Sequence, residues 1–513
     1  MSKFNWGMRA CGVLLLWAGA AVALPAQTTV APTVTFTTLH SFDYADGYFP
    51  DAALIQGTDG AFYGTTSSGG ANADGTVFKI TPGGTLTTVH TFSGTDGAYP
   101  NGGLVQGANG KLYGTTSAGG PNTACVNGGC GTVFTITPSG MLTTLYNFCS
   151  QSNCTDGYVP EAELVQGTDG NFYGTTLFGG ASSACSNGCG TVFKITPGGT
   201  LTTLHSFDGT DGAGPQAGLI QATNGKFYGT TTGGGANGPY GTVFEITPSG
   251  KLTTLNSFDG ADGSEVDGAL VQATDGNFYG TTFEGGANHI CGLDNIETCG
   301  EVFKMTPSGS LTVFYSFCSQ GGLNCTDGEY PAAGLIQGTD GNFYGTTAGG
   351  GANRNGNICD YVGCGTAFKI TPDGALTTLY NFCSQGDTCT DGAESEGALV
   401  QGTSGNFYGT TVYGGTSDNC FTGCGTIFSL SVGLGPFVET QPTVGEVGAA
   451  VNILGTNLTG STKVTFHGTA ATFTVKSKSE ITTTVPVGAT TGIVKVVTDG
   501  STLSSNGPFR VTP

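Results

Sequence analysis

The chain has 513 residues, of which 10% are charged and 92 are glycine, and its formal net charge is −21. High glycine with little charge is typical of a turn-rich all-β protein, and the regular recurrence of 31 phenylalanines and 18 tyrosines argues against disorder. The negative charge argues against nucleic acid and anionic membrane surfaces as partners.

The first 26 residues have the pattern of a Sec-type export signal. Two positive residues near the start precede a short apolar run, Val13 to Leu24, and small residues follow, so cleavage is expected after Ala23 or Ala26. The run is too short for a membrane-spanning helix, and no later segment has the length and apolar character of one. We therefore predict a secreted or cell-surface protein without a membrane span.

Residues 33–433 contain seven copies of one repeat. Each copy has a variant of Phe62-Tyr63-Gly64-Thr65-Thr66, and a Gly-Thr-Val-Phe-Lys-like segment follows it. In six copies a Leu-Thr-Thr-Leu-Tyr-Asn-Phe-like segment comes next. With a short strand before the first motif, each copy is predicted to form four strands joined by Asp-Gly-type and Thr-Pro-x-Gly turns.

The seventh copy has no fourth strand, and a matching segment stands before the first copy. Residues 425–430 have no such successor, whereas residues 36–42 precede the first repeat. A closed ring explains this order, because the N-terminal strand then completes the last unit. We predict an all-β fold: a seven-bladed β-propeller whose N-terminal strand closes the last blade, followed by a small Ig-like β-sandwich.

The recurring aromatic residues are predicted to pack between blades rather than to form a platform for sugars. They occur once per blade within strands, as interblade packing requires. Gly64 and its equivalents are predicted to let neighbouring sheets approach closely.

Length varies in only two loops of each unit. The strand-one leucine and the strand-two tyrosine are nine positions apart in every copy, and the third and fourth strands also keep a constant spacing. The insertions fall between strands two and three and between strand four and the next strand one. Both connections of an antiparallel blade emerge on one face, which we call the loop-rich face, and we predict that a ligand binds there.

Sixteen of the 17 cysteines follow the signal and form eight close pairs. An even number of cysteines in an exported protein predicts disulfides. Zinc is the competing interpretation, weakened because no Cys-x-x-Cys occurs and only His289 lies near a pair. Cross-pairing between neighbouring loops stays open, for instance among residues 125, 130, 149 and 154. The predicted disulfides are Cys125–Cys130, Cys149–Cys154, Cys185–Cys189, Cys291–Cys299, Cys318–Cys325, Cys359–Cys364, Cys383–Cys389 and Cys420–Cys424.

Two families resemble parts of the chain. The repeats resemble the GloVer tandem-repeat family of exported bacterial proteins, through Gly-Asn-Phe-Tyr-Gly-Thr-Thr at 170–176 and Gly-Thr-Val-Phe-Lys-Ile-Thr-Pro at 190–197. Residues 434–513 resemble the IPT/TIG family of Ig-like domains, through 451–458, 464–468 and 492–498. The second resemblance implies a small β-sandwich, which the strand alternation also indicates. The first implies no known activity.

An Asp-Gly pair follows strand four in every copy, with aspartates at 46, 96, 156, 211, 262, 327 and 391. Such a ring of carboxylates offers oxygen ligands for Ca²⁺. We favour an Asp turn in which the side chain bonds its own backbone, because the residue recurs in every blade. No other cofactor and no metal-ligating residue is predicted.

The sequence shows no catalytic constellation. It contains neither a Gly-x-Ser-x-Gly elbow nor a His-Glu-x-x-His helix, and His40, His90 and His205 share a position that tyrosine or asparagine fills in other copies. Acidic residues found in single blades are better candidates for a ligand site, because one site must break the symmetry of the ring. They are Glu161, Glu163, Glu265, Asp267, Glu284, Glu329, Glu394 and Glu396.

We therefore expect a non-enzymatic binding protein for a polysaccharide or a surface protein, and we assign no catalytic residue. A carbohydrate-active hydrolase or lyase that uses a pair of these carboxylates is the first alternative. A structural spacer in the envelope is the second.

Overall fold

The computed structural model describes residues 33–125, 128–288, 291, 298–355, 358–359, 363–386 and 388–512. The predicted export signal and His289 lie outside these residues. Among the described residues, no helix is long and apolar enough to cross a membrane. Strands dominate the described ranges, where the three helical segments are single 3-10 turns, η1 (Ser152–Cys154), η2 (Gly322–Asn324) and η3 (Leu458–Gly460).

The repeats form seven four-stranded antiparallel sheets within the described ranges. The first three sheets contain β2 (Ile55–Gln56), β3 (Phe62–Thr66), β4 (Thr76–Ile80) and β5 (Leu86–Thr91); β6 (Val105–Gln106), β7 (Leu112–Thr116), β8 (Thr132–Ile136) and β9 (Leu142–Asn147); β10 (Val165–Gln166), β11 (Phe172–Thr176), β12 (Thr191–Ile195) and β13 (Leu201–Ser206). The next three contain β14 (Ile220–Gln221), β15 (Phe227–Thr231), β16 (Thr242–Ile246) and β17 (Leu252–Ser257); β18 (Val271–Gln272), β19 (Phe278–Thr282), β20 (Glu301–Met305) and β21 (Leu311–Ser316); β22 (Ile336–Gln337), β23 (Phe343–Thr347), β24 (Thr366–Ile370) and β25 (Leu376–Asn381).

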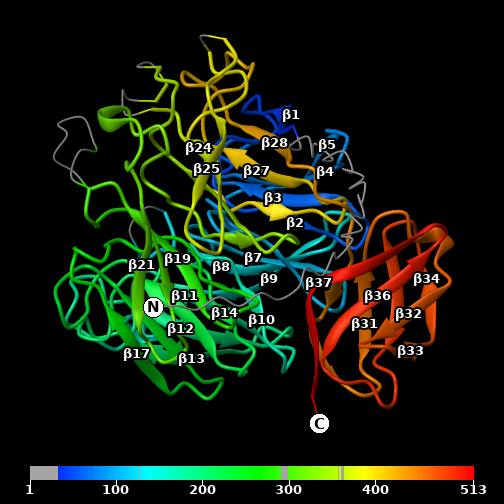
Figure 1. Cartoon of the computed structure of the whole chain (residues 1–513). Coiled ribbons are helices and arrows are strands. Elements are labelled where there is room, and N and C mark those ends of the chain that lie inside the picture. Colours follow the sequence, from blue (N-terminus) through cyan, green and yellow to red (C-terminus); the bar gives the residue numbers. More distant parts are fainter. Residues whose placement is uncertain are drawn as a thin grey trace, which may run out of the picture. The chain divides into compact units, whose positions relative to one another are not determined.

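The last sheet joins the two ends of the repeat region. It has the order β1-β28-β27-β26, with β26 (Val400–Gln401), β27 (Phe407–Thr411), β28 (Thr426–Ser431) and the N-terminal β1 (Thr35–Ser41). β1 runs antiparallel to β28 from the Thr35–Ser431 pair to the Ser41–Thr426 pair (Figure 1). The predicted closure of the propeller by the N-terminal strand is therefore confirmed.

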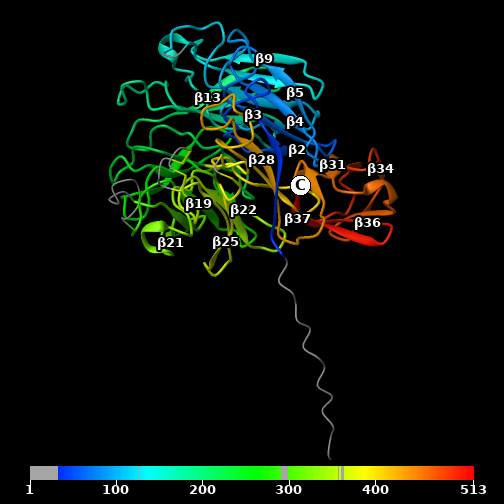
Figure 2. The same cartoon turned by 90° about the horizontal axis from the view of Figure 1, so that it is seen from above.

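A ring of glutamines connects each blade to the preceding one. The side-chain carbonyl of Gln106, on β6, accepts the backbone N–H of Thr58 at 3.0 Å, and its amide donates to Gly110 of its own hairpin. The same link recurs in every blade. The ring closes where Gln56 accepts from Thr403, 347 residues away, at 2.8 Å. Figure 2 labels β2 of the first sheet and β28 of the last sheet.

The strand-two aromatic residues pack between blades, as predicted. Tyr113 stacks on Phe172 of the following blade with ring centroids 3.9 Å apart, and other blades repeat this contact. The prediction that Gly64 lets a neighbouring sheet approach closely was wrong. A Cβ there would lie 2.5 Å from Phe78 and 2.7 Å from Leu54, which belong to the same blade. The glycine makes room for an aromatic ring that lies across its own sheet.

Gly280→Ala is expected to lower the free energy of unfolding by about 1–3 kcal/mol, because overpacking a filled core forces side chains out of their rotamers. Its new Cβ would lie 2.5 Å from Phe303 and 2.8 Å from Leu270. Urea unfolding measures the change. Gly83→Ala is the control, because its nearest neighbour, the Thr81 hydroxyl, is 3.9 Å away. Equal stability of the two variants would contradict the packing argument.

The C-terminal strands form the Ig-like sandwich. One sheet contains β29 (Glu439–Gln441), β31 (Ala450–Leu454), β35 (Glu480–Thr484) and β34 (Phe473–Val475). The other contains β30 (Val444–Glu446), β37 (Ser501–Thr512), β36 (Gly492–Thr498), β32 (Lys463–Phe466) and β33 (Thr469–Ala471). Buried Val451, Ile481 and Val494 belong to the core between the sheets. The predicted fold class, a propeller followed by an Ig-like domain, is confirmed.

Candidate ligand site on the propeller axis

One position in each blade leads the chain from the loop-rich face into the innermost strand. It lies three residues before the strand-one leucine and carries Asp51, Asn101, Glu161, Gln216, Asp267, Ala332 and Glu396. Its acidic members belong to blades 1, 3, 5 and 7. Asp51 interacts electrostatically with Glu396 and Glu161, and Asp267 interacts with the same two glutamates. Groups in non-neighbouring blades meet only across the axis, so we call Asp51, Glu161, Asp267 and Glu396 the axial acidic cluster.

A repeated left-handed residue directs the chain toward the axis. We call the position three residues before the strand-one leucine the axial position. Two residues before it, φ is positive in every blade, at Phe49, Tyr99, Val159, Gly214, Glu265, Tyr330 and Glu394. This conformation is strained for a side chain other than glycine, above all for β-branched Val159. Two hydrogen bonds hold it there: Val159 donates its N–H to Cys130 of the preceding blade at 3.1 Å and accepts from Leu177 at 2.9 Å.

Burial and mutual repulsion keep protons on part of the cluster. Burial, with the nearby charges of Glu396 and Glu161, raises the pKa of Asp51 to about 8. Burial, with the charges of Glu265 and Glu396, raises the pKa of Asp267 to about 7. Burial also raises the pKa of Glu396. Because these carboxyls repel one another, a positive group placed among them would displace protons.

Two residues at the axial position, Gln216 and Asp51, differ in their hydrogen bonds. Gln216 donates its amide N–H to Glu161 Oε2 at 3.0 Å. Asp51 Oδ1 is buried and has no hydrogen-bond partner. A buried acceptor without a partner is unfavourable, so this oxygen is a candidate ligand contact.

Glu163 is a further carboxyl, two residues after Glu161 in the chain. The other blades have alanine or glycine at this position. A Cβ at Gly218 would lie 2.7 Å from Glu163 Cγ, and a Cβ at Gly103 would lie 3.0 Å from its Oε2. The side chain therefore uses space left by glycines on both neighbouring blades. Burial raises its pKa.

The structure brings together most of the acidic residues singled out from the sequence. The charges of Glu265 and Glu284 also act on Asp267. Glu329 is 2% exposed and forms a β-bridge with Gly349, and Glu394 occupies the left-handed position. Sequence reasoning missed Asp51, although aligning the repeats on the strand-one leucine places it level with Glu161.

The aspartates after strand four make the contacts of Asp turns. Asp156 accepts the backbone N–H of Ser150 at 2.8 Å and that of Gln151 at 3.2 Å, while Tyr146 on β9 donates to it at 2.8 Å. In other blades a histidine replaces the tyrosine, as in the 2.8 Å contact of His40 with Asp46. These histidines therefore have a structural partner.

Asp391→Ala is expected to lower the free energy of unfolding by about 3 kcal/mol, because a buried carboxylate that accepts several hydrogen bonds is lost. Its donors are Tyr380 at 2.7 Å, the N–H and the hydroxyl of Ser384, both at 2.8 Å, and the Gln385 N–H at 3.1 Å. Thermal unfolding measures the effect, and exposed Asp373→Ala is the control. A chelator is expected to leave wild-type unfolding unchanged. Destabilisation by the chelator would instead favour a calcium ring.

The cysteine pairs stiffen the loop-rich face. The structure bonds all eight pairs locally, and the described disulfides lie in the two variable loops of the blades. The carbonyls of Cys130, Cys299 and Cys364 accept the N–H of the left-handed residue in the following blade. These disulfides therefore support the backbone that presents the axial position.

These observations define an all-β propeller of repeated four-stranded sheets with a C-terminal Ig-like domain. The family model described as the Gloeobacter/Verrucomicrobia repeat matches residues 25–185 and 126–359, and the IPT/TIG domain model matches residues 438–511. The chain therefore belongs to the Gloeobacter/Verrucomicrobia repeat family, as its motifs predicted. A comparison with curated protein sequences found no match.

Two solved structures are similar to this chain at low sequence identity. A fungal alcohol oxidase of the AA5 family, in complex with copper, is 12% identical, with a TM-score of 0.51, over 94% of this chain and 100% of that one. A gluconolactonase from Xanthomonas campestris is 12% identical, with a TM-score of 0.37, over 63% of this chain and 89% of that one. At such identity the likeness concerns the fold alone.

Proposed function

We propose that this chain is an exported, non-enzymatic binding protein whose ligand enters the loop-rich face and places a positive group in the axial acidic cluster. The observation that carries the proposal is the buried, unpartnered Oδ1 of Asp51 among carboxyls that repel one another. A basic side chain of a surface protein suits this site better than an anionic polysaccharide, because it would relieve that repulsion. The predicted signal and the many disulfides support export.

A lysine-rich peptide is a direct probe. The chain from residue 27 is expected to bind a labelled peptide that contains five lysines and not to bind a glutamate-rich peptide of equal length. Fluorescence anisotropy measures both. Affinity is expected to fall as salt rises. Asp51→Asn combined with Asp267→Asn and Glu396→Gln is expected to weaken binding at least tenfold. Glu446→Gln, an exposed change in the Ig-like domain, is the control. Equal binding by both variants would sink the proposal.

One observation favours an enzyme as the second candidate. Asp51, whose pKa is raised, interacts electrostatically with Glu161, and a pair of carboxyls with different proton affinities is what glycoside hydrolysis uses. Release of reducing ends from neutral polysaccharides by the wild type, abolished in Asp51→Asn and Glu161→Gln, would establish this alternative. Absence of release alongside specific peptide binding would exclude it for the polysaccharides tested.

A further inference from the structure

Disulfides from two different loops meet in three blades. Cys291 and Cys299 lie between strands two and three of blade 5, and Cys318 and Cys325 follow strand four of that blade. Their four Sγ atoms all lie within 4.8 Å of one another, and Cys291 Sγ is 3.8 Å from Cys325 Sγ. Residues 359, 364, 383 and 389 form the same four-sulfur arrangement in blade 6, whereas in blade 2 only the three sulfurs of residues 125, 130 and 149 lie within this distance.

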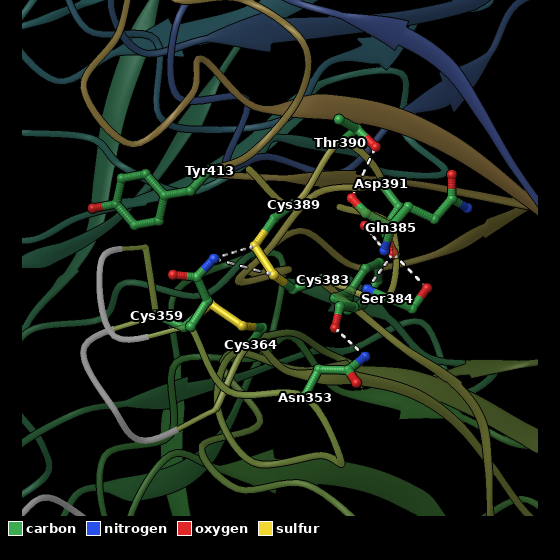
Figure 3. The surroundings of a disulfide bond; sticks show 12 residues. Asn353, Cys359, Cys364, Cys383, Ser384, Gln385, Cys389, Thr390, Asp391 and Tyr413 are labelled. Carbon is green, nitrogen blue, oxygen red and sulfur yellow. Dashed lines mark hydrogen bonds between the residues drawn. A yellow bond between two sulfur atoms is a disulfide. The ribbon is translucent and has the colours of Figure 1, made fainter. Parts of the chain in front are cut away.

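The cluster of blade 6 is enclosed and has a polar donor. Figure 3 shows its two disulfides next to each other. Cys359, Cys364 and Cys389 are fully buried. Asn355 donates its side-chain N–H to Cys383 Sγ at 3.8 Å and to Cys389 Sγ at 3.6 Å. Disulfide sulfur accepts hydrogen bonds weakly, whereas a metal-bound thiolate carries charge that such a donor stabilises.

We propose that each four-sulfur cluster, once reduced, is a tetrathiolate site for a soft divalent cation such as Zn²⁺. Tetrahedral zinc with Zn–S bonds of about 2.3 Å holds its sulfurs about 3.8 Å apart. The Cys291–Cys325 separation already has this length. In the sequence, the absence of Cys-x-x-Cys argued against zinc. In the structure, the four cysteines of each set come from two separate loops, and a rule based on spacing within one loop does not detect such a set.

The chemistry balances with a thiol reductant. Two disulfides take up four electrons and four protons and become four thiols, while the reductant is oxidised to its own disulfides. Zn²⁺ then binds four thiolates and releases four protons. The β1–β28 pair and the glutamine ring close the propeller without these bonds, so reduction leaves the scaffold in place. The cation would then hold together the two loops of each blade.

Isolated pairs in the same chain provide a matched control. Cys185–Cys189 lies between strands two and three of blade 3, but the loop after strand four of that blade has no cysteine. A Cβ on Gly209 would lie 4.0 Å from both of these sulfurs, so glycine stands where the second pair would be. A site that needs four sulfurs cannot form there.

The test measures zinc retained by the full chain from residue 27 after desalting. The protein reduced by a non-chelating phosphine is expected to retain one Zn²⁺ for each of the two four-sulfur clusters, and the oxidised protein none. Cys359→Ser with Cys364→Ser is expected to lose one equivalent, and Cys185→Ser with Cys189→Ser none. Circular dichroism shows whether each variant folds. If the variant with Cys359→Ser and Cys364→Ser unfolds, the variant with Cys383→Ser and Cys389→Ser takes its place in the test. No retained zinc, or equal losses in the cluster and control variants, overturns the proposal.

Discussion

A chain that begins at residue 43 is expected to lose cooperative folding, whereas one that begins at residue 33 keeps it. Without β1, the edge of β28 loses its whole hydrogen-bonded partner. Phe42, which is fully buried, and Phe36, which stacks on Tyr380 at 3.8 Å and on Phe428 at 5.1 Å, are lost as well. Their contribution is comparable with the whole stability of a typical domain, about 5–15 kcal/mol.

Urea unfolding followed by near-ultraviolet circular dichroism measures this loss. A synthetic peptide of residues 33–46 is expected to restore the transition when added to the shortened chain. At the level of one side chain, Phe42→Ala is expected to lower the free energy of unfolding by about 3–5 kcal/mol. Phe421→Ala is the matched control, because that ring is 99% exposed. Normal folding of the chain without β1 would show that the ring does not depend on this strand.

The second large effect is a pH dependence that the axial cluster imposes on stability. Asp51 and Asp267 have pKa values of about 8 and about 7 in the folded chain, against 3.8 for an ordinary aspartate. At a pH between the pKa of an ordinary aspartate and these raised pKa values, the folded state binds more protons than the unfolded state. The free energy of unfolding therefore falls as pH rises from about 4 to about 8. Below about pH 4 both states are protonated, and the effect is absent.

Asp51→Asn combined with Asp267→Asn is expected to remove this part of the slope. Each pKa unit corresponds to about 1.4 kcal/mol, and partial hydration of the site reduces the total, so we expect the double variant to exceed the wild type by about 2 kcal/mol at pH 8. The two proteins should converge near pH 4. Denaturant unfolding across this pH range measures the difference, and Asp373→Asn should keep the wild-type slope. Parallel curves for the double variant and the wild type would contradict the raised pKa values.

Much of the fold followed from spacing, and the misplaced strand at residues 36–42 was sufficient to predict the β1–β28 pair. The packing of Tyr113 and its equivalents followed too, because a residue that recurs once per blade within a strand meets the same neighbour each time. The partner of Gly64 did not follow. Which ring fills the space beside a glycine depends on side-chain directions, and repeat spacing does not specify these.

Sequence alone determined the ring, its closure and the face that carries the variable loops, because strand periodicity and loop length are local properties of the chain. Only the tertiary structure decided which side chains meet on the axis. Asp51 and Glu161 are 110 positions apart, and the cysteines of one four-sulfur cluster come from separate loops. The axial carboxyls come together when the ring closes, whereas the two cysteine-bearing loops come together when their own blade folds. The raised pKa values arise from the burial and mutual repulsion of the carboxyls on the axis.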